Sequence, residues 1–334
     1  MSMLKLSGWV EINGQRLTPQ DIEAMIKDHR EEVLKFGGEF FFAGHGCRAR
    51  DHFGIMPGKC PKGTLICDGA VKGSINPAVP DLPLEEAIIT AVNLRSDQGL
   101  TALSGGVDST LVAQLARREC VAVGLVDSHD IHQARRVAEV LKLSCTYVTI
   151  TPQEIAAALP VVLKAIPTKD PVNTSIALTQ YFVARFAGEQ GYQRILTGQG
   201  ADELFGGYAR YLETPTLDKD LERDFIGLEQ QADRDQAIAA LHSTYFSMPF
   251  MDVRVVRAAR AIPAEEKVQG GRRKVPLRQV AERHIPPEFA WYEKKAMQYG
   301  SGVWKELQKL ARKNGYKVSL QDYIDHISGE DHGH

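Results

Sequence analysis

The sequence predicts an α/β protein: a parallel sheet flanked by helices, with a helical C-terminal part and a small α+β N-terminal region. Apolar strand-like segments alternate with helical patterns between residues 84 and 196, which is typical of a parallel sheet covered by helices on both faces. Before this part, three prolines between residues 76 and 83 disfavour regular structure. After residue 208, nearly every periodic segment is helical.

The expected elements follow the period of the apolar residues. The N-terminal region contains a polar helix over Pro19–Lys35 and apolar segments around Glu39–Ala43 and Thr64–Cys67. The alternating part contains helices at Leu84–Leu94, Ser109–Arg118, His132–Leu141, Pro152–Ile166 and Thr174–Glu189, and strands at Leu100–Leu103, Val121–Val126, Thr146–Ile150 and Arg194–Leu196. The later helices are Asp218–Leu241, Asp252–Ala261 and Pro276–His284.

Length and composition indicate a soluble protein of about two domains. A single core rarely grows beyond roughly 250–300 residues, and this chain has 334. The net charge of −2 gives no electrostatic reason to expect nucleic acid as a partner. Apolar runs stay well short of the roughly 18–20 residues that cross a bilayer, and the N-terminus lacks a signal-peptide pattern. We therefore expect a cytoplasmic protein with no membrane partner.

Five cysteines form no CxxC pair, and their odd number argues against a complete disulfide framework. Cys120 and Cys145 flank expected strands and are interpreted as small core residues. Cys47, Cys60 and Cys67 could meet a metal together with a nearby histidine, but their spacing is not diagnostic.

The run Ser104–Thr110 reads Ser-Gly-Gly-Val-Asp-Ser-Thr and lies between an apolar strand and a helix. Its glycines let backbone N–H groups point at phosphate oxygens, with the positive end of the helix dipole behind them. Its two serines add hydroxyl donors, and Asp108 can hold magnesium. An ordinary glycine turn is the alternative interpretation.

A second glycine-containing block, from Leu196 to Tyr208, follows the expected strand at 194–196. Thr197, Gly198 and Gln199 follow that strand, and glycine lets the backbone approach a ligand closely. Asp202 and Glu203 place carboxylates at the end of the loop.

The first run resembles the pyrophosphate loop, SGGxDS, of the ATP pyrophosphatase superfamily. The second block resembles the SGEGSDE…FGGY signature of asparagine synthetases and of the related β-lactam and carbapenam synthetases. Met248–Asp252 resembles the VPFLD segment of the same family, and Trp291–Gly302 resembles its lysine-bearing loop. The resemblance extends from about Leu84 to about Gly302.

This resemblance implies an adenine nucleotide alpha hydrolase-like fold and an AMP-forming carbon–nitrogen ligase that uses ATP and Mg²⁺. A carboxylate would attack the α-phosphorus of ATP, and ammonia or an amine would then displace AMP. The favoured interpretation is an ammonia-dependent, asparagine synthetase-like enzyme of amino-acid biosynthesis. The alternatives are an amide ligase or cyclase for a different carboxylate and a non-catalytic ATP-binding regulatory protein.

The resemblance also implies the site residues. The nucleotide contacts would come from Leu103, Ser104, Gly105, Gly106, Asp108, Ser109, Thr110, Val123, Thr197 and Gly198. Asp108 and Asp202 would be the magnesium ligands. Lys294 would balance charge on the phosphorus and on the tetrahedral intermediate, with Lys295 as the competing assignment. The basic run Arg272–Lys274 could contact phosphate or carboxylate, although such a run is usually a solvated loop.

Gln199 departs from the family pattern, which has glutamate here in asparagine synthetases and tyrosine in the β-lactam branch. A neutral amide can orient an amine by hydrogen bonds but cannot act as a base near neutral pH. Either another residue, with Glu203 nearest in sequence, is the base, or the substrate is not aspartate.

The segments Gly38–Ala43 and Ala49–Ile55 resemble the GEFAFA and ARDxFGI segments of the family's glutaminase domain. That domain uses an N-terminal cysteine, whereas Ser2 follows Met1 here. We interpret residues 1–80 as a shortened, inactive glutaminase-like remnant, 81–325 as the ATP pyrophosphatase domain and 326–334 as a tail. Nitrogen would then come from free ammonia, from a substrate amine or from a separate glutaminase partner. The sequence leaves open whether the protein forms a homodimer.

Overall fold

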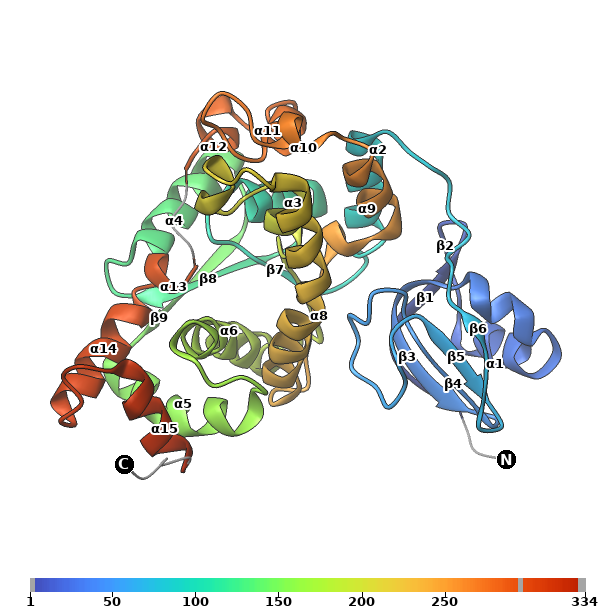
Figure 1. The fold of residues 1–334 in the computed structure, drawn as a ribbon, viewed down its shortest axis with the longest axis horizontal. Coiled ribbons are helices and arrows are strands. Elements are labelled where there is room, and N and C mark those ends of the chain that lie inside the picture. The colour runs from blue at the N-terminus through green and yellow to red at the C-terminus, as the bar shows by residue number, and fades with distance from the viewer. Residues whose placement is uncertain (1–3, 294–296, 330–334) are drawn as a thin grey trace. The chain divides into compact units, whose positions relative to one another are not determined.

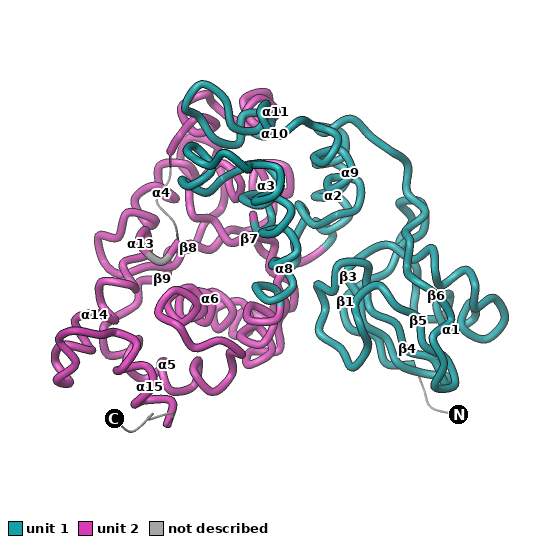
Figure 2. Tube along the Cα trace, in the orientation of Figure 1, with its two compact units in different colours: residues 1–97, 199–232, 247–277 teal, residues 98–198, 233–246, 278–334 magenta. Residues whose placement is uncertain are grey.

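The computed structural model describes residues 4–293 and 297–329, which form two compact units of interleaved chain segments (Figure 2). Unit 1 contains residues up to 97 together with 199–232 and 247–277. Unit 2 contains 98–198 and 233–246 together with residues from 278 onward. Both units are therefore assembled from segments that are distant in the sequence.

Unit 2 is built on the sheet that the sequence predicts. Its strands are β7 (Leu100–Ala102), β8 (Cys120–Leu125), β9 (Cys145–Ile150) and β10 (Arg194–Leu196), with β11 (Tyr245–Ser247) at one edge in the order β11-β10-β7-β8-β9. β7 pairs in parallel with both β8 and β10. The side chains of β8 are almost continuously buried, as expected for a strand with both faces covered.

Helices cover both faces of this sheet (Figure 1). α3 (Val107–Ala116) and α4 (His129–Leu141) lie on one face, and α5 (Pro152–Ala165) and α6 (Pro171–Glu189) lie on the other. The later helices of the unit are α12 (Pro287–Ala290), α13 (Met297–Gly300), α14 (Val303–Lys313) and α15 (Leu320–Ser328). The predicted parallel sheet between two helical layers is thus confirmed.

Several helices begin earlier than the sequence pattern suggests. α6 begins at Pro171 rather than at residue 174, because the Asp170 side chain accepts a hydrogen bond of 2.9 Å from the Asn173 backbone N–H. α3 and α4 begin two and three residues earlier than predicted, at Val107 and His129. Caps and first turns are polar or glycine-rich, so apolar periodicity does not locate them.

The strand order creates a topological switch point in unit 2. The chain runs from β7 outward to β8 and β9 and then returns to place β10 on the other side of β7. In open α/β sheets, ligands bind beyond the carboxyl ends of the strands at such a point. The loops after β7 and β10 are those two loops, and they carry the Ser104–Thr110 run and Thr197–Gly198.

The N-terminal part of unit 1 is an antiparallel sheet with the order β2-β1-β3-β4-β5-β6. Its strands are β1 (Lys5–Ile12), β2 (Gln15–Arg16), β3 (Gly37–Gly44), β4 (Cys47–Arg50), β5 (Thr64–Cys67) and β6 (Ala70–Ser74). α1 (Pro19–Asp28) packs Ile22 and Ile26 against Phe40 and Phe42 of β3. This is the α+β region that the sequence predicts, although the pattern did not identify β1, β4 or β6.

The predicted helix over Pro19–Lys35 is two elements. α1 ends before His29, and a 3₁₀ helix follows at Arg30–Lys35. Between Ile26 and Val33 the sequence has only charged residues and a histidine, so a full turn lacks apolar contacts that would continue the helix. A disulfide joins Cys47 to Cys67 on the neighbouring strands β4 and β5.

The rest of unit 1 is helical. Its elements are α2 (Leu84–Asn93), α7 (Ala201–Phe205), 3₁₀ helices at Ala209–Leu212 and Pro249–Met251, α9 (Val253–Arg260) and α10 (Ala264–Lys267). α8 (Leu217–Ala240) and α11 (Val275–Ala281) each contribute residues to both units. Among the described residues, no helix is both long and apolar enough to cross a membrane.

Asp51 is a buried carboxylate in the N-terminal sheet region. Its oxygens accept hydrogen bonds of 2.9 Å from the backbone N–H groups of Ile55 and Met56. Burial raises the pKa of Asp51 to about 6, although these donors act in the opposite direction. The unfolded chain therefore ionises this group at lower pH than the folded chain does.

We predict that Asp51→Asn reduces the pH dependence of stability. The contribution of Asp51 is complete below its ordinary pKa of 3.8 and is lost as the pH rises through about 6. Relative to the variant, the parent should lose on the order of 3 kcal/mol between those limits, since one pKa unit corresponds to about 1.4 kcal/mol. Urea unfolding of both proteins at pH 4 and at pH 7 measures this difference, and a constant difference would contradict it.

Candidate active site

The glycine loop of unit 2 has the strand–loop–helix geometry that binds anions. β7 ends at Ala102 and α3 begins at Val107, so the loop leads to the N–H groups that have no partner within the helix. Gly105 has a φ of +77°, and a Cβ at this position would lie 2.5 Å from Cγ of Gln133 in α4. Glycine is therefore required for the loop to pack this closely against α4.

Hydroxyl groups tie this loop together. The Ser104 backbone N–H donates to Oγ of Ser109 over 3.2 Å, and the two hydroxyl oxygens lie 2.9 Å apart. Within the described part of the chain, Thr110 Oγ1 is buried and has no hydrogen-bond partner. Buried polar atoms normally have partners, so a bound group that supplies one would fit here.

The loop after β10 meets the glycine loop. A Cβ on Gly198 would lie 2.7 Å from Cβ of Asp108 and 2.9 Å from the backbone nitrogen of Ser109. Asp108 is half-buried in the first turn of α3, and Thr197 is buried. The structure thus brings together the two unit 2 loops that the sequence identified.

Leu103 and Val123 lie beside these loops. The Leu103 backbone N–H donates to Val121 O of β8 over 2.9 Å, and Val123 is in the same strand. Both side chains are buried, with 3% and 6% of their surface exposed. These residues therefore line the carboxyl half of the sheet next to the glycine loop.

Lys294 and its alternative Lys295 lie outside the described residues, but both flanking segments are anchored in unit 2. Before them, the Tyr292 hydroxyl lies 2.6 Å from Nε2 of His129, at the start of α4. After them, Ser301 O accepts a hydrogen bond of 3.0 Å from the Leu125 backbone N–H at the end of β8. The described residues on either side of these lysines therefore contact the start of α4 and the end of β8.

Gln199, Asp202 and Glu203 belong to unit 1. Gly200, with a φ of +87°, leads into the short helix α7, which carries both acidic residues. Gln199 is half-buried. Since Gly198 and Gln199 are consecutive, the second glycine block crosses from one unit to the other.

Asp202 forms an ion pair with Lys274, the last residue of the basic run Arg272–Lys274, for which the sequence left open a ligand contact or a solvated loop. Lys274 Nζ lies 2.8 Å from Oδ1 of Asp202, and 8% of the lysine side chain is exposed. A Cβ on Gly207 would overlap both side chains, so glycine is required there. Lys274 is thus a buried cation, although it belongs to a run of three basic residues. Nothing in the local sequence distinguishes it from its two arginine neighbours.

Glu203 is buried within unit 1. Its Oε1 atom accepts hydrogen bonds from the Tyr208 hydroxyl and, over 3.0 Å, from Nε2 of Gln231 in α8. Burial raises the pKa of Glu203, and the nearby charge of Asp202 raises it further. A carboxyl group with a raised pKa suits proton transfer near neutral pH, but Glu203 also holds α7 against Tyr208 and α8.

The described residues contain no all-protein metal cage. Within residues 4–293 and 297–329, no group of three or more histidine, cysteine or acidic side chains is placed to hold a metal. Mg²⁺ bound with a nucleotide usually takes one or two carboxylates and completes its shell with phosphate oxygens and water. Asp108 of unit 2 is a carboxylate of this kind, whereas Asp202 of unit 1 is paired with Lys274.

The chain matches the asparagine synthase family over residues 84–227 and 227–326. It is 32% identical over 290 residues to a putative glutamine-hydrolysing asparagine synthetase of Methanocaldococcus jannaschii, covering 73% of this chain and 53% of that protein. It is 30% identical over 239 residues to the carboxyethyl-arginine beta-lactam-synthase of Streptomyces clavuligerus, covering 70% and 46%. The chain thus spans about half the length of the curated relatives it matches.

Among solved structures, one similar chain is an NH3-dependent NAD synthetase from Campylobacter jejuni. The sequence identity is 14% and the TM-score is 0.34, over 74% of this chain and 93% of that one. This similarity is too low to support an argument.

We predict that Gly198→Ala weakens MgATP binding while the fold is retained. Its Cβ would press on the backbone of Ser109 and shift the N–H groups of the glycine loop, and we expect the affinity to fall by about tenfold, which corresponds to about 1.4 kcal/mol of binding free energy. Isothermal titration calorimetry measures the change. Gly227→Ala is the control, because a Cβ there meets nothing within 4 Å, and equal affinities of the two variants would refute the close contact.

Proposed function

The chain belongs to the asparagine synthase family, and from that premise we propose that it is an ATP-dependent ligase that forms an amide and releases AMP and pyrophosphate. The observation that carries the proposal is the contact between the glycine loop and the loop after β10 at the switch point of the unit 2 sheet. These loops offer backbone N–H groups and hydroxyls where phosphate groups bind in such sheets.

In the proposed first step, a substrate carboxylate oxygen attacks the α-phosphorus of ATP and pyrophosphate leaves. The loop from Ser104 to Thr110 would bind the departing pyrophosphate through its N–H groups and hydroxyls. Leu103, Val123, Thr197 and Gly198 would contact the adenosine. Asp108 and Asp202 would hold magnesium, which supplies positive charge to the phosphate oxygens. The protein thus contributes position and charge.

In the proposed second step, an amine nitrogen attacks the acyl carbon of the adenylate. AMP leaves, and the nitrogen gives up a proton. Lys294 would stabilise negative charge in both steps, as its match to the family's lysine suggests. The contacts of Tyr292 with the start of α4 and of Ser301 with the end of β8 support this role, because both follow the carboxyl end of a strand of the unit 2 sheet.

In this proposal, Gln199 and Glu203 have different roles at the attacking amine. Gln199 would orient the nitrogen through its amide group, since it cannot remove a proton. Glu203 is the candidate base because its pKa is raised by burial. Gln199 also favours a second candidate function, a ligase or cyclase for a carboxylate other than aspartate.

Ammonia or a substrate amine is the proposed nitrogen source. In the segment that resembles the glutaminase domain, Arg50 donates from Nε to Met56 O and from Nη2 to Gly54 O, both over 2.6 Å. This guanidinium is therefore engaged in holding its own loop. The proposal that glutamine is not the nitrogen source rests on Ser2, which stands where the family's glutaminase has its cysteine.

A pyrophosphate-release assay tests the function. We expect AMP and pyrophosphate in equal amounts with one member of a panel of carboxylates, in the presence of ammonium or an amine, and no such products with glutamine as the nitrogen donor. ADP and phosphate as first products would contradict the proposal. Aspartate-dependent AMP formation would identify the asparagine synthetase-like reaction, and its absence beside activity on another carboxylate would favour the second candidate.

We predict that Lys294→Ala slows amide synthesis by about a hundredfold or more with little change in ATP binding, comparable to the loss of one preorganised charge-stabilising donor. Single-turnover kinetics with the active carboxylate measures this change. Lys295→Ala is the control and should retain activity. The reverse pattern would show that the assignment is off by one residue, and two neutral variants would remove this loop from the chemistry.

A further inference from the structure

Glu39 is a charged residue in a strand that is otherwise apolar or glycine. Phe40 and Phe42 of β3 face the core formed with α1, and side chains alternate along a strand. Glu39 therefore points out of the opposite face of the sheet, where it is completely buried. The face of β3 opposite the apolar core is thus covered at Glu39.

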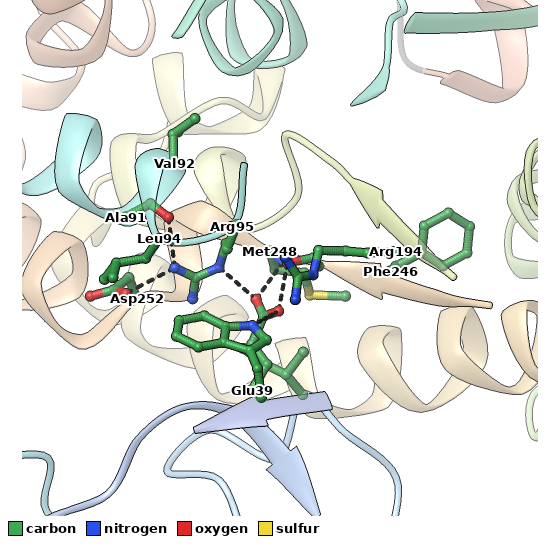
Figure 3. Close-up of polar contacts among 12 residues, drawn as sticks. Glu39, Ala91, Val92, Leu94, Arg95, Arg194, Phe246, Met248 and Asp252 are labelled. Carbon is green, nitrogen blue, oxygen red and sulfur yellow. Dashed lines mark hydrogen bonds and ion pairs between the residues drawn. The ribbon is translucent and has the colours of Figure 1, made fainter. Parts of the chain in front are cut away.

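The partners of Glu39 come from the chain at 247–248, from Arg95 just after α2 and from β1 (Figure 3). Its carboxylate accepts hydrogen bonds from the Ser247 hydroxyl over 2.5 Å and from the Met248 backbone N–H over 2.8 Å. Arg95 donates to it from Nε over 2.8 Å, and Trp9 donates from its indole over 3.2 Å. One carboxylate therefore joins strand β3 to residues that lie more than 200 positions away in the sequence.

These contacts keep Glu39 ionised. Burial alone would raise the pKa of Glu39, but the Arg95 guanidinium and the hydrogen bonds from Ser247 and Met248 outweigh burial and lower it. The other end of Arg95 donates to Asp252 Oδ2 over 2.9 Å, and Asp252 caps the first turn of α9. Glu39 therefore holds the beginning of the segment from 247 to 252 directly, and it holds the end of that segment through Arg95.

The segment from 247 to 252 packs directly on residues 199–205, which include α7. The rings of Phe250 and Phe205 are in an edge-to-face arrangement with centroids 6.2 Å apart. A Cβ on Gly200 would lie 3.0 Å from the sulfur of Met251. Every member of this chain of contacts belongs to unit 1, and it leads from the N-terminal sheet to the helix that carries Asp202 and Glu203.

A second attachment reaches the same helix from another side. Lys62 Nζ lies 2.7 Å from Glu229 of α8, and the rings of Phe53 and Phe225 meet edge to face. Gln231, near Glu229 in α8, donates to Glu203. The N-terminal region therefore supports α7 through α8 as well as through residues 247–252.

We propose that Glu39 is a positioning residue and that the N-terminal sheet holds the segment Gln199–Glu203, which forms the start of α7, in its active arrangement. This inference rests on the proposed function for its effect on rate, but its structural part does not. The N-terminal region would then act as a support for the ligase site. Loss of the Glu39 carboxylate should loosen residues 199–208 and leave the glycine loop of unit 2 unchanged.

The test compares Glu39→Gln with the parent by hydrogen–deuterium exchange and by kinetics. We expect faster exchange over residues 199–208 and unchanged exchange over 104–110. We also expect kcat to fall by about tenfold to a hundredfold, the size of effect that a small misplacement of reacting groups produces, with KM for ATP roughly unchanged. Ser247→Ala removes one donor without leaving a buried charge unpaired, and it serves if Glu39→Gln does not fold.

Phe42→Leu is the matched control, since it weakens the core on the other face of the same strand. Parent-like exchange over 199–208 in Glu39→Gln, or in Ser247→Ala if that variant has to serve, would overturn the proposal. An equal increase in Phe42→Leu at the same melting temperature would also overturn it. If the parent forms no AMP with any carboxylate, the proposed function fails, while the exchange comparison still decides the positioning role.

Discussion

Unit 1 depends on a buried network of ionic contacts. Glu11 and Glu39 of the N-terminal sheet, Asp252 and the guanidinium groups of Arg95 and Arg254 contact one another at 2.7–3.1 Å. Removal of one partner from such a network is costly because it leaves an uncompensated charge in a poorly solvated place. The hydrogen bonds from Trp9, Ser247 and Met248 offset the excess negative charge. Charge, rather than apolar area alone, therefore holds the segments of this unit together.

The elements whose structure depends on local sequence patterns could be predicted from the sequence. The run from Ser104 to Thr110 and the strands β7, β8 and β10 follow from apolar period and glycine placement, and the parallel sheet follows from alternation with helices, whereas the strand order comes from the structure alone. The strands β1, β4 and β6 were not recognised, because they are short, are interrupted by polar residues or contain glycine. Their pairing is a property of the sheet rather than of each segment.

Long-range polar contacts account for most of what the sequence did not reveal at the candidate site. Lys274 follows two arginines and resembles a solvated run, yet it is buried beside Asp202 because Gly207 leaves room for both. The glutamate of β3 similarly looked like part of a glutaminase-like motif. Its partners at 247 and 248 lie 208 and 209 residues away, a separation that no local period encodes. Lys294 lies outside the described residues, so its role stays a prediction.

The span of the Glu11–Arg254 pair has a consequence for biosynthesis. The two residues are 243 positions apart, and ribosomes add about 5–20 residues per second. On the order of ten to fifty seconds therefore pass between the synthesis of Glu11 and the synthesis of its partner, Arg254. Until Arg254 is synthesised, the carboxylate of Glu11 lacks the ion-pair partner that it has in the finished unit. Completion of the buried ionic network is thus a late event in synthesis, because it requires residue 254 of a 334-residue chain.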